Sequence, residues 1–546
     1  MSTVESYTRN TITNKNTLFS PMKSTVETSF YMNNTKHLCS VSKAYELSLL
    51  NKGMIVLDRE VSHPEELGLP EGAKILVDNG GAVTGRTAAA RRIKGDNPNE
   101  DKAIEKIARQ AIFDSRFRTF YNASAYVGLD KEFMVKAHLN ISEEYVGNLY
   151  TWLMNFQACN EAYDELYEKS THYENESDIF VYCDPDWQHE DYPNGLAYFD
   201  VLHNTAIILG LQYFGELKKG TLTLAWATAE RNNYVPCHGG LKIFNREKDS
   251  YVASFFGLSG SGKSTLTHAK HEDKYDIKVL HDDAFIIDKN DGSSIALEPA
   301  YFDKTNDYAG GHPAQDYFVT IQNIGVVPDE EGKLAIQADD IRNGNGRTIK
   351  SRYSTDNRVD RIEEGIDSIF WIIKDNAFPP ITKITNSALA TAFGLTLMTK
   401  RSTAENLVGG QKPGEKLVIE PFANPFRVYP LINDYKNFKT LFDSDVDCYL
   451  INTGDFMDQD IPKEVTLSIL ESIVEGTAEF ESFGNLTDLE YIHFDEFDPD
   501  FEDSHYTDTL ASRIEFRIEY IKEFNEKYPE HAIPEETLDV LSKLVN

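Results

Sequence analysis

The segment YVASFFGLSGSGKST, residues 251–265, constrains this chain more than any other stretch. Residues 252–256 form a short apolar run that predicts a buried strand. Gly257, four residues, then Gly262, Lys263 and the next serine follow the phosphate-loop pattern. In that pattern glycines let successive N–H groups point at phosphate oxygens, the lysine adds positive charge and the serine offers a hydroxyl to a divalent cation. We therefore predict a strand, a phosphate-binding loop and a helix.

A pair of acids downstream supports this interpretation over a chance match in a glycine-containing turn. Residues 278–280 predict a short strand, and Asp282 and Asp283 follow it closely. Phosphate-loop enzymes hold their cation at an acid that follows an apolar strand. Two adjacent carboxylates repel each other unless a cation neutralises them. The pair therefore favours a metal site over a solvated turn.

Composition narrows the class of protein. The 546 residues include 88 acids against 54 bases, a net charge of −34, which argues against nucleic acid or an anionic membrane as a partner. The five cysteines are scattered without CxxC spacing, which favours a reduced protein over a disulfide framework or a zinc site. No apolar run reaches the ~18 residues of a membrane helix, and the first residues lack the apolar core of a signal peptide. We expect a cytoplasmic protein.

Three further segments offer candidate ligands. YFGELKKG, residues 213–220, contains two adjacent lysines, although such a pair is commonly a solvated hairpin end. Residues 221–229, TLTLAWATA, predict a strand, and residues 236–240, PCHGG, predict a tight turn that presents a histidine. A lone histidine is usually structural. The arginine of Gly85-Arg86 suits a carboxylate or phosphate, with solvated surface arginine as the alternative.

Taken in order, these segments resemble ATP-dependent phosphoenolpyruvate carboxykinase. That family typically shows Tyr-Gly-Gly-Glu-Met-Lys-Lys, a histidine nineteen residues after the second lysine, Gly-Leu-Ser-Gly-Thr-Gly-Lys-Thr and Gly-Asp-Asp-Glu. The counterparts here are residues 213–219, His238, residues 257–264 and the Asp282-Asp283 pair. Gly85-Arg86 resembles the family's Thr-Gly-Arg-Ser-Pro, and residues 345–347 resemble its Asn-Thr-Arg. The resemblance covers roughly residues 45 to 525.

The resemblance implies a role for each matching residue. The expected catalytic residues are Arg86, Lys218, Lys219, Lys263, Asp282 and Arg347, and the expected substrate ligands are Arg86, Tyr213, Lys219 and Arg347. The expected metal ligands are Lys219, His238 and Asp283 for manganese, and Ser264 for magnesium. The expected nucleotide contacts are Leu258, Ser259, Gly260, Ser261, Gly262, Lys263, Ser264, Thr265, Glu298 and Thr466.

The implied reaction is metal-dependent decarboxylation of oxaloacetate, with phosphoryl transfer from ATP, giving phosphoenolpyruvate, CO2 and ADP. Mn2+ and Mg2+ are the expected cofactors, and the partners are small molecules. A lysine that binds a metal must be neutral, so its pKa must lie well below the ordinary ~10.4. A neighbouring dication and a second lysine both lower it.

Several departures from the family leave alternatives open. DFMDQDI, residues 455–461, stands where the family has Gly-Thr-Gly-Lys-Arg-Ile, and Asp460 aligns with the arginine. LEPAYFDKT, residues 297–305, lacks both glycines of the family segment. An acid near phosphates is unfavourable, so either the base is recognised differently or the donor is not ATP. The alternatives are a kinase of the same fold that acts on another small acid or hydroxyl, and a non-catalytic nucleotide-binding relative.

We predict an α/β protein with a two-domain, phosphoenolpyruvate carboxykinase-like fold. Residues 1–245 form the expected substrate domain, and residues 246–546 the expected phosphate-loop nucleotide-binding and C-terminal domain, with the active site in the cleft. Near the C-terminus, Ile514, Ile518, Ile521 and Phe524 recur at helical spacing. They predict an amphipathic helix that packs on the core.

Overall fold

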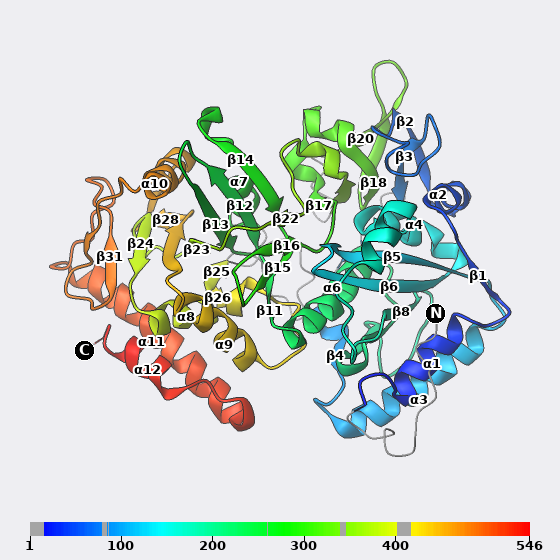
Figure 1. The fold of residues 1–546 in the computed structure, drawn as a ribbon, viewed down its shortest axis with the longest axis horizontal. Coiled ribbons are helices and arrows are strands. Elements are labelled where there is room, and N and C mark those ends of the chain that lie inside the picture. Colours follow the sequence, from blue (N-terminus) through cyan, green and yellow to red (C-terminus); the bar gives the residue numbers. More distant parts are fainter. Residues whose placement is uncertain are drawn as a thin grey trace. The chain divides into compact units, whose positions relative to one another are not determined.

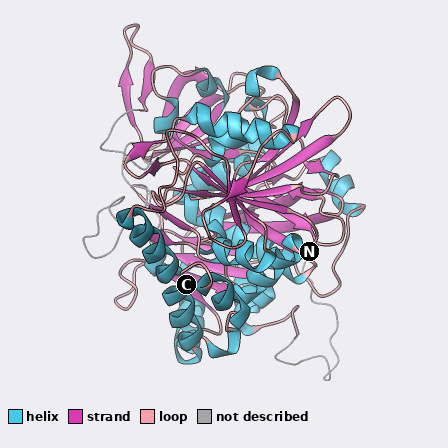
Figure 2. Ribbon diagram, turned by 90° about the vertical axis from the view of Figure 1, so that its left-hand side faces the viewer, coloured by secondary structure: helices cyan, strands magenta, loops and turns pink. Residues whose placement is uncertain are grey.

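The chain is an α/β protein, as predicted. The computed structural model describes residues 16–78, 84–85, 87–258, 260–338, 346–400 and 417–545, in which helices and strands are interspersed (Figures 1 and 2). The described residues divide into two compact units. The first takes its residues from Met1–Thr228 and Leu297–Asp356, and the second from Ala229–Ala296, Asn357–Ser402 and Lys412–Asn546. These limits differ from the predicted boundary near residue 245, because a segment after residue 296 pairs with N-terminal strands.

The first unit contains two mixed sheets. The larger has the strand order β1-β5-β6-β8-β10-β9-β4, and the smaller the order β17-β21-β18-β3-β2. The strands of the larger sheet are β1 (Thr35–His37), β4 (Arg91–Ile93), β5 (Phe120–Asp130), β6 (Phe133–Ser142), β8 (Ile179–Asp184), β9 (Leu196–Asp200) and β10 (Thr205–Leu209), with β7 (Gln157–Ala158) beside β5. Those of the smaller are β2 (Ile55–Glu60), β3 (Lys74–Asp78), β17 (Tyr301–Lys304), β18 (Phe318–Gln322) and β21 (Arg347–Lys350), and β19 (Gly325–Pro328) pairs with β20 (Leu334–Gln337).

Helices cover the strands of the first unit. They are α1 (Pro21–Ser29), α2 (Val41–Ser48), α3 (Pro98–Ser115), α4 (Val146–Asn155), α5 (Glu161–Glu168) and α6 (Phe214–Arg231). Helices α1 and α3 lie side by side (Figure 1) and bury Val26 and Ile104 against Phe180 and Tyr198 of the larger sheet. Burying such side chains contributes roughly 25 cal/mol for each Å2 of apolar surface. This core fixes the sheet on which α6 rests.

The second unit is built on a sheet with the order β14-β12-β13-β23-β27-β24-β31-β30, in which β13, β23 and β27 are parallel. Its strands are β12 (Gly240–Asn245), β13 (Ser250–Phe256), β14 (Asp276–His281), β23 (Ser368–Ile373), β24 (Ile381–Ile384), β27 (Asp447–Asn452), β30 (Glu481–Ser482) and β31 (Leu489–Tyr491). A second sheet joins β11 (Tyr234–His238), β15 (Ala284–Asp288), β16 (Ser294–Ala296) and β22 (Arg361–Ile362). Two short pairs are β25 (Met398–Lys400) with β26 (Leu417–Ile419), and β28 (Asp455–Phe456) with β29 (Gln459–Asp460).

The helices of the second unit are α7 (Lys263–His268), α8 (Ser387–Leu395), α9 (Leu431–Phe442), α10 (Lys463–Glu475), α11 (Ser504–Lys527) and α12 (Glu535–Ser542). The predicted amphipathic helix is α11, whose Ile514 and Ile521 are buried. No helix in the described ranges combines the length and apolarity needed to cross a lipid bilayer.

Two local predictions around residue 230 were wrong. Residues 221–229, predicted as a strand, belong to α6. Both faces of this part of the helix are buried, so its sequence of small, apolar and threonine residues lacks a helical period. The predicted tight turn at residues 236–240 is the end of β11, where His238 is the last strand residue. The strands predicted at residues 252–256 and 278–280 were confirmed as parts of β13 and β14.

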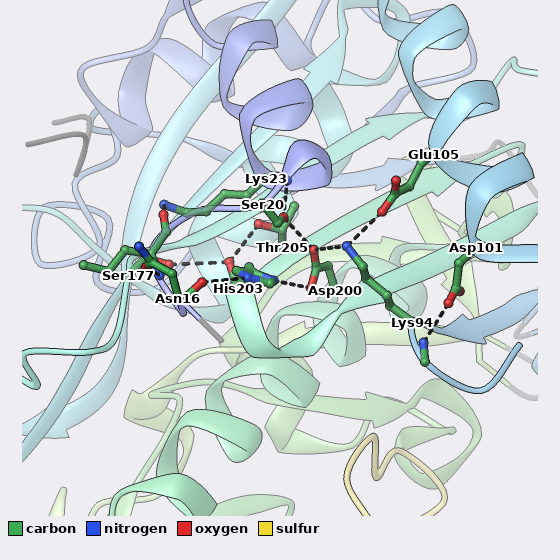
Figure 3. A network of polar contacts seen from close by, with 12 residues as sticks. Asn16, Ser20, Lys23, Lys94, Asp101, Glu105, Ser177, Asp200, His203 and Thr205 are labelled. Atoms are coloured by element: carbon green, nitrogen blue, oxygen red, sulfur yellow. Dashed lines mark hydrogen bonds and ion pairs between the residues drawn. The ribbon is translucent and has the colours of Figure 1, made fainter. Parts of the chain in front are cut away.

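A buried polar network ties the segment before α1 to the larger sheet of the first unit (Figure 3). The carboxylate of Asp200 accepts from Ser20 Oγ at 2.7 Å and lies 2.5 Å from His203 Nδ1 and 3.0 Å from Lys94 Nζ. His203 Nε2 lies 3.0 Å from the backbone carbonyl oxygen of Asn16. Burial alone raises the pKa of Asp200, but His203 and Lys94 outweigh burial and lower it overall. Asp200 therefore stabilises the fold as a carboxylate.

We expect Asp200→Asn to lower the free energy of unfolding at pH 7 by about 3 kcal/mol, because His203 and Lys94 lose a buried anionic partner. A lowered pKa contributes stability that is present above the unfolded value of ~3.9 and is lost as pH falls through the folded value. The gap between wild type and variant should therefore shrink as pH falls below about 4. Urea unfolding at several pH values measures this, and a gap independent of pH would contradict the assignment.

Candidate active site

The predicted phosphate loop joins β13 to α7 in the second unit. Gly260 and Gly262 have φ angles of 83° and 97°, in the left-handed region that glycine adopts without steric cost. Gly257 is equally required, because a Cβ there would clash with Ser261 Oγ. The Ser261 hydroxyl is buried and has no hydrogen-bond partner among the described residues. Such an orphaned group inside a phosphate loop fits a site completed by a ligand.

Thr453, which sequence reasoning missed, braces this loop. It follows β27, and its Oγ1 donates to the backbone carbonyl of Ser261 at 2.6 Å. The loop lies at the carboxyl end of β13, on the same edge of the sheet as the ends of β23 and β27. Ligands of open α/β sheets bind at the carboxyl ends of the strands. The signal that could have identified Thr453 is its place directly after an apolar strand.

Thr453→Val removes that hydroxyl while keeping the shape of the side chain. A hydrogen bond of this kind contributes about 1 kcal/mol, so we expect magnesium-nucleotide binding to weaken by about five-fold. Isothermal titration calorimetry measures the change. Thr440→Val, which alters an exposed hydroxyl on α9, serves as the control. Unchanged nucleotide affinity in Thr453→Val would show that the loop does not need this brace.

His238 and Asp283 form the second part of the site. Strand register places His238 opposite Ala284, so the end of β11 lies beside the turn between β14 and β15. His238 Nε2 is 3.0 Å from Asp283 Oδ1, and Lys263 Nζ is 3.8 Å from the same oxygen. The two glycines after His238 allow this approach, because a Cβ on Gly240 would clash with Thr267 of α7.

The donor set suits a divalent cation. His238 Nδ1 faces the carbonyl oxygen of Ala423, which can only accept, so Nδ1 carries a proton. Nε2 then directs its lone pair at the Asp283 carboxylate unless a second proton or a cation lies between them. One imidazole nitrogen and one carboxylate oxygen, with the other ring nitrogen fixed by a carbonyl, is a common arrangement for metal ligands.

Asp282 lies on the other side of this turn. Its side chain is buried, and Oδ2 is 3.4 Å from His268 Nε2. Burial raises the pKa of Asp282, but the neighbouring charges of His268 and Lys263 lower it well below its usual range. His281 Nδ1 accepts from the backbone N–H groups of Asp283 and Ala284. Asp282 is therefore an anion held at the end of α7.

In the first unit, residues at the end of β18 contact Thr84 and Phe214 and pair with Arg347. Arg347 pairs with Gln322 in the strand register, and Gln322 Oε1 accepts from the backbone N–H of Phe214, the residue after Tyr213. The next residue, Asn323, binds both the N–H and the carbonyl of Thr84, two residues before Arg86. Three segments distant in sequence therefore meet here.

The N-terminal turn of α6 contacts Thr87. Thr87 donates its backbone N–H to Glu216 Oε1 at 3.1 Å. The ring of Tyr213 packs over Gly215, where a Cβ would clash with it. Lys219 lies one turn further along α6, half-buried, with Nζ 5.5 Å from the ring of Trp226. Thr87 is therefore attached to the same helix that carries the predicted lysine ligand.

Lys218 and Glu298 form a fully buried ion pair in the first unit. Lys218 Nζ lies 2.9 Å from Glu298 Oε1, and neither side chain is exposed. Asn155 donates to the other carboxylate oxygen at 2.6 Å. The pair links α6 to the segment before β17. The predictions that Lys218 is catalytic and that Glu298 contacts a nucleotide remain predictions.

The remaining predicted residues differ in their exposure. Arg86 and Ser259 lie outside the described residues. Ser264 and Thr265 are exposed at the start of α7, and Leu258 is buried. Thr466 is buried in α10, where its hydroxyl donates to the carbonyl of Lys463 at 2.8 Å. Asp460 is exposed on β29. Within the described ranges, no three His, Cys, Asp or Glu side chains gather into a metal cluster.

Comparison with known proteins assigns the family. The sequence profile of the family described as phosphoenolpyruvate carboxykinase matches residues 56–497, which is more than half of the chain. The chain belongs to this family. This assignment agrees with the resemblance found from the motifs.

Individual relatives are distant. A protein of Aeropyrum pernix named phosphoenolpyruvate carboxykinase (ATP) is 26% identical over 296 residues, which cover 51% of this chain and 58% of that protein. Proteins with the same name from Flavobacterium johnsoniae and Eremothecium gossypii are 24% and 23% identical, covering 71% and 74% of this chain and 73% and 78% of their own lengths. The chain thus spans little more than half the length of the first of these relatives.

Proposed function

We propose that this member of the phosphoenolpyruvate carboxykinase family decarboxylates oxaloacetate and transfers a phosphoryl group from ATP to the resulting enolate. One observation carries the proposal. Lys263 of the phosphate loop lies 3.8 Å from Asp283, which is itself 3.0 Å from His238. A phosphate-binding lysine and two groups suited to a divalent cation therefore surround one point, which a simple nucleotide-binding loop does not require.

Each half of the reaction has candidate residues. Arg86, Tyr213 and Arg347 would bind the carboxylate and phosphate of the substrate, because arginine offers paired donors to planar anions. A divalent cation held by Lys219, His238 and Asp283 would supply Lewis-acid stabilisation of the enolate oxyanion. Lys263 and Ser264 would orient the phosphates for in-line attack by the enolate oxygen.

The bond changes of the proposed reaction involve only the substrate and the phosphoryl donor. Loss of CO2 leaves an electron pair that becomes the enolate, and the enolate oxygen forms a bond to the terminal phosphorus while the bond to the leaving ADP breaks. No protein nucleophile is needed. The chain contributes position and charge, which are the main terms in phosphoryl transfer.

Asp460 bears on the identity of the donor. In the structure its carboxylate is exposed on β29, and Thr466 directs its hydroxyl into its own helix. Neither side chain supplies a positive charge to the phosphates of a nucleotide. The donor is therefore the part of the proposal that an experiment must test with several compounds.

The test supplies oxaloacetate with Mn2+ and Mg2+, and offers ATP, GTP and pyrophosphate in separate reactions. Phosphoenolpyruvate is measured with a coupled assay, and CO2 is measured independently. We expect both products with ATP. If phosphoenolpyruvate formed with pyrophosphate but not with ATP or GTP, the proposed reaction would stand and the proposed donor would be wrong. Phosphorylation without CO2 release would indicate a kinase, and binding without any product would indicate a non-catalytic relative.

A further inference from the structure

A buried lysine contacts the far end of the phosphate-loop helix. Lys242 lies on β12 and is fully buried. Its Nζ donates to the carbonyl oxygen of Leu266 at 2.7 Å and to that of Ala269 at 3.1 Å. Leu266 lies in the last turn of α7 and Ala269 directly follows it, where the backbone leaves acceptors without partners inside the helix. A positive charge here also complements the negative end of the helix.

A histidine and a glutamate complete the environment of Lys242. His271 Nε2 lies 3.1 Å from Lys242 Nζ, and His271 Nδ1 lies 2.8 Å from Glu471 Oε1. An ammonium group has three N–H donors and no acceptor. Leu266, Ala269 and His271 offer it three acceptors when the histidine proton is on Nδ1 and is donated to Glu471. All four contacts are satisfied by one arrangement of protons.

This arrangement connects two helices of the second unit. Lys242 and His271 pack around Phe244, with Lys242 Nζ 4.6 Å from the ring centre. Glu471 lies on α10, which belongs to the same apolar core as Leu266 of α7. Burial lowers the pKa of Lys242 well below its ordinary value, and the charge of Glu471 opposes this shift. Glu471 therefore supports the protonated form of Lys242 against the effect of burial.

The backbone around His271 is held in an uncommon conformation. His271, Glu272 and Asp273 have φ angles of 52°, 54° and 59°, all in the left-handed region without a glycine. Such residues persist only where the surrounding structure determines them. The contacts of His271 with Lys242 and Glu471 supply that constraint, so the turn that follows α7 is fixed rather than loose.

We propose that Lys242 is a positioning residue for the phosphate loop, acting through the C-terminal carbonyl groups of α7 and held in place by His271 and Glu471. Helix α7 has only six residues. A shift of its last turn therefore moves Lys263 and the loop at its first turn. The inference rests on the proposed function, because it assumes that the loop binds the phosphates of the donor.

The test compares Lys242→Met, Glu471→Gln and the double variant with the wild-type chain. Calorimetry measures binding of magnesium-ATP and of magnesium pyrophosphate, and electron paramagnetic resonance measures Mn2+ binding. We expect Lys242→Met to weaken phosphate-donor binding by roughly ten- to a hundred-fold, since small displacements of positioned groups have effects of this size. Mn2+ affinity should change by less than about two-fold.

Glu471 is partly exposed, so Glu471→Gln tests the same network without changing a fully buried side chain. It should weaken donor binding less than Lys242→Met, and the double variant should be no weaker than Lys242→Met alone, because Glu471 acts through Lys242. Lys278→Met, on the neighbouring strand β14, removes an exposed lysine and should bind as wild type. Circular dichroism establishes that each variant is folded.

The outcomes are distinguishable. If the wild-type chain binds the donor, and folded Lys242→Met or Glu471→Gln binds it with the same affinity, the positioning role alone is overturned. Additive losses in the double variant would also overturn it, because the two residues would act separately. A wild-type chain that binds neither ATP nor pyrophosphate would overturn the proposed function and this inference together.

Discussion

Lys263→Ala should lower kcat/KM for phosphoenolpyruvate formation by at least about 10³-fold. Lys263 is largely buried, and its ammonium lies 3.8 Å from Asp283 Oδ1, so its charge acts where solvent screening is weak. Alanine leaves the loop glycines in place but removes the cation that balances charge on the transferring phosphoryl group. The loss should appear in kcat as well as in KM.

Lys278→Ala provides the matched control for Lys263→Ala. Its side chain is 41% exposed and pairs with Asp276 at 2.9 Å on the surface of β14. Exposed pairs contribute little, so activity should stay within about two-fold of wild type. Full activity in Lys263→Ala would show that the phosphate loop does not serve the reaction.

Asp283→Asn should weaken Mn2+ binding by about 100-fold and lower kcat with it. The amide keeps the size of the side chain and can donate to His238 Nε2, but it lacks the negative charge that a divalent cation requires. Nucleotide binding should change far less, because the phosphate loop keeps Lys263 and its glycines. Electron paramagnetic resonance of free Mn2+ and calorimetry with nucleotide separate the two effects.

Asp276→Asn is the control for loss of one carboxylate from the same strand. Asp276 is exposed at the start of β14, whereas Asp283 follows the end of this strand. Mn2+ affinity in Asp276→Asn should equal that of wild type. If Asp283→Asn bound Mn2+ normally while losing activity, Asp283 would have a role other than metal binding.

Local patterns were sufficient to predict the centre of the second unit. The apolar run of β13, the glycines of the loop and the acids after β14 each carry their meaning within a few residues. The same reasoning failed for residues 221–229. A segment buried on all sides has no polar face whose period separates a helix from a strand, and residues 221–229 of α6 are buried in this way.

The supporting residues could not be predicted, because tertiary contacts define them. In the sequence, Lys242 cannot be distinguished from an ordinary lysine on a strand, because its role follows from its contacts with α7 and His271. Thr453 contacts the loop across 192 residues of sequence. The limits of the two units depend on pairing between β3 and β18, in which Leu76 lies opposite Thr320. A local sequence pattern carries no information about a contact partner so distant in the sequence.

The central claim is that this chain joins decarboxylation to phosphoryl transfer at one site. The most direct measurement incubates the wild-type protein with oxaloacetate, Mn2+, Mg2+ and ATP labelled in its terminal phosphate, and follows the label. We predict that the label appears in phosphoenolpyruvate in a one-to-one ratio with released CO2, and that Lys263→Ala abolishes both. Label that remains in ATP, or enters another product while CO2 is not released, would contradict this account.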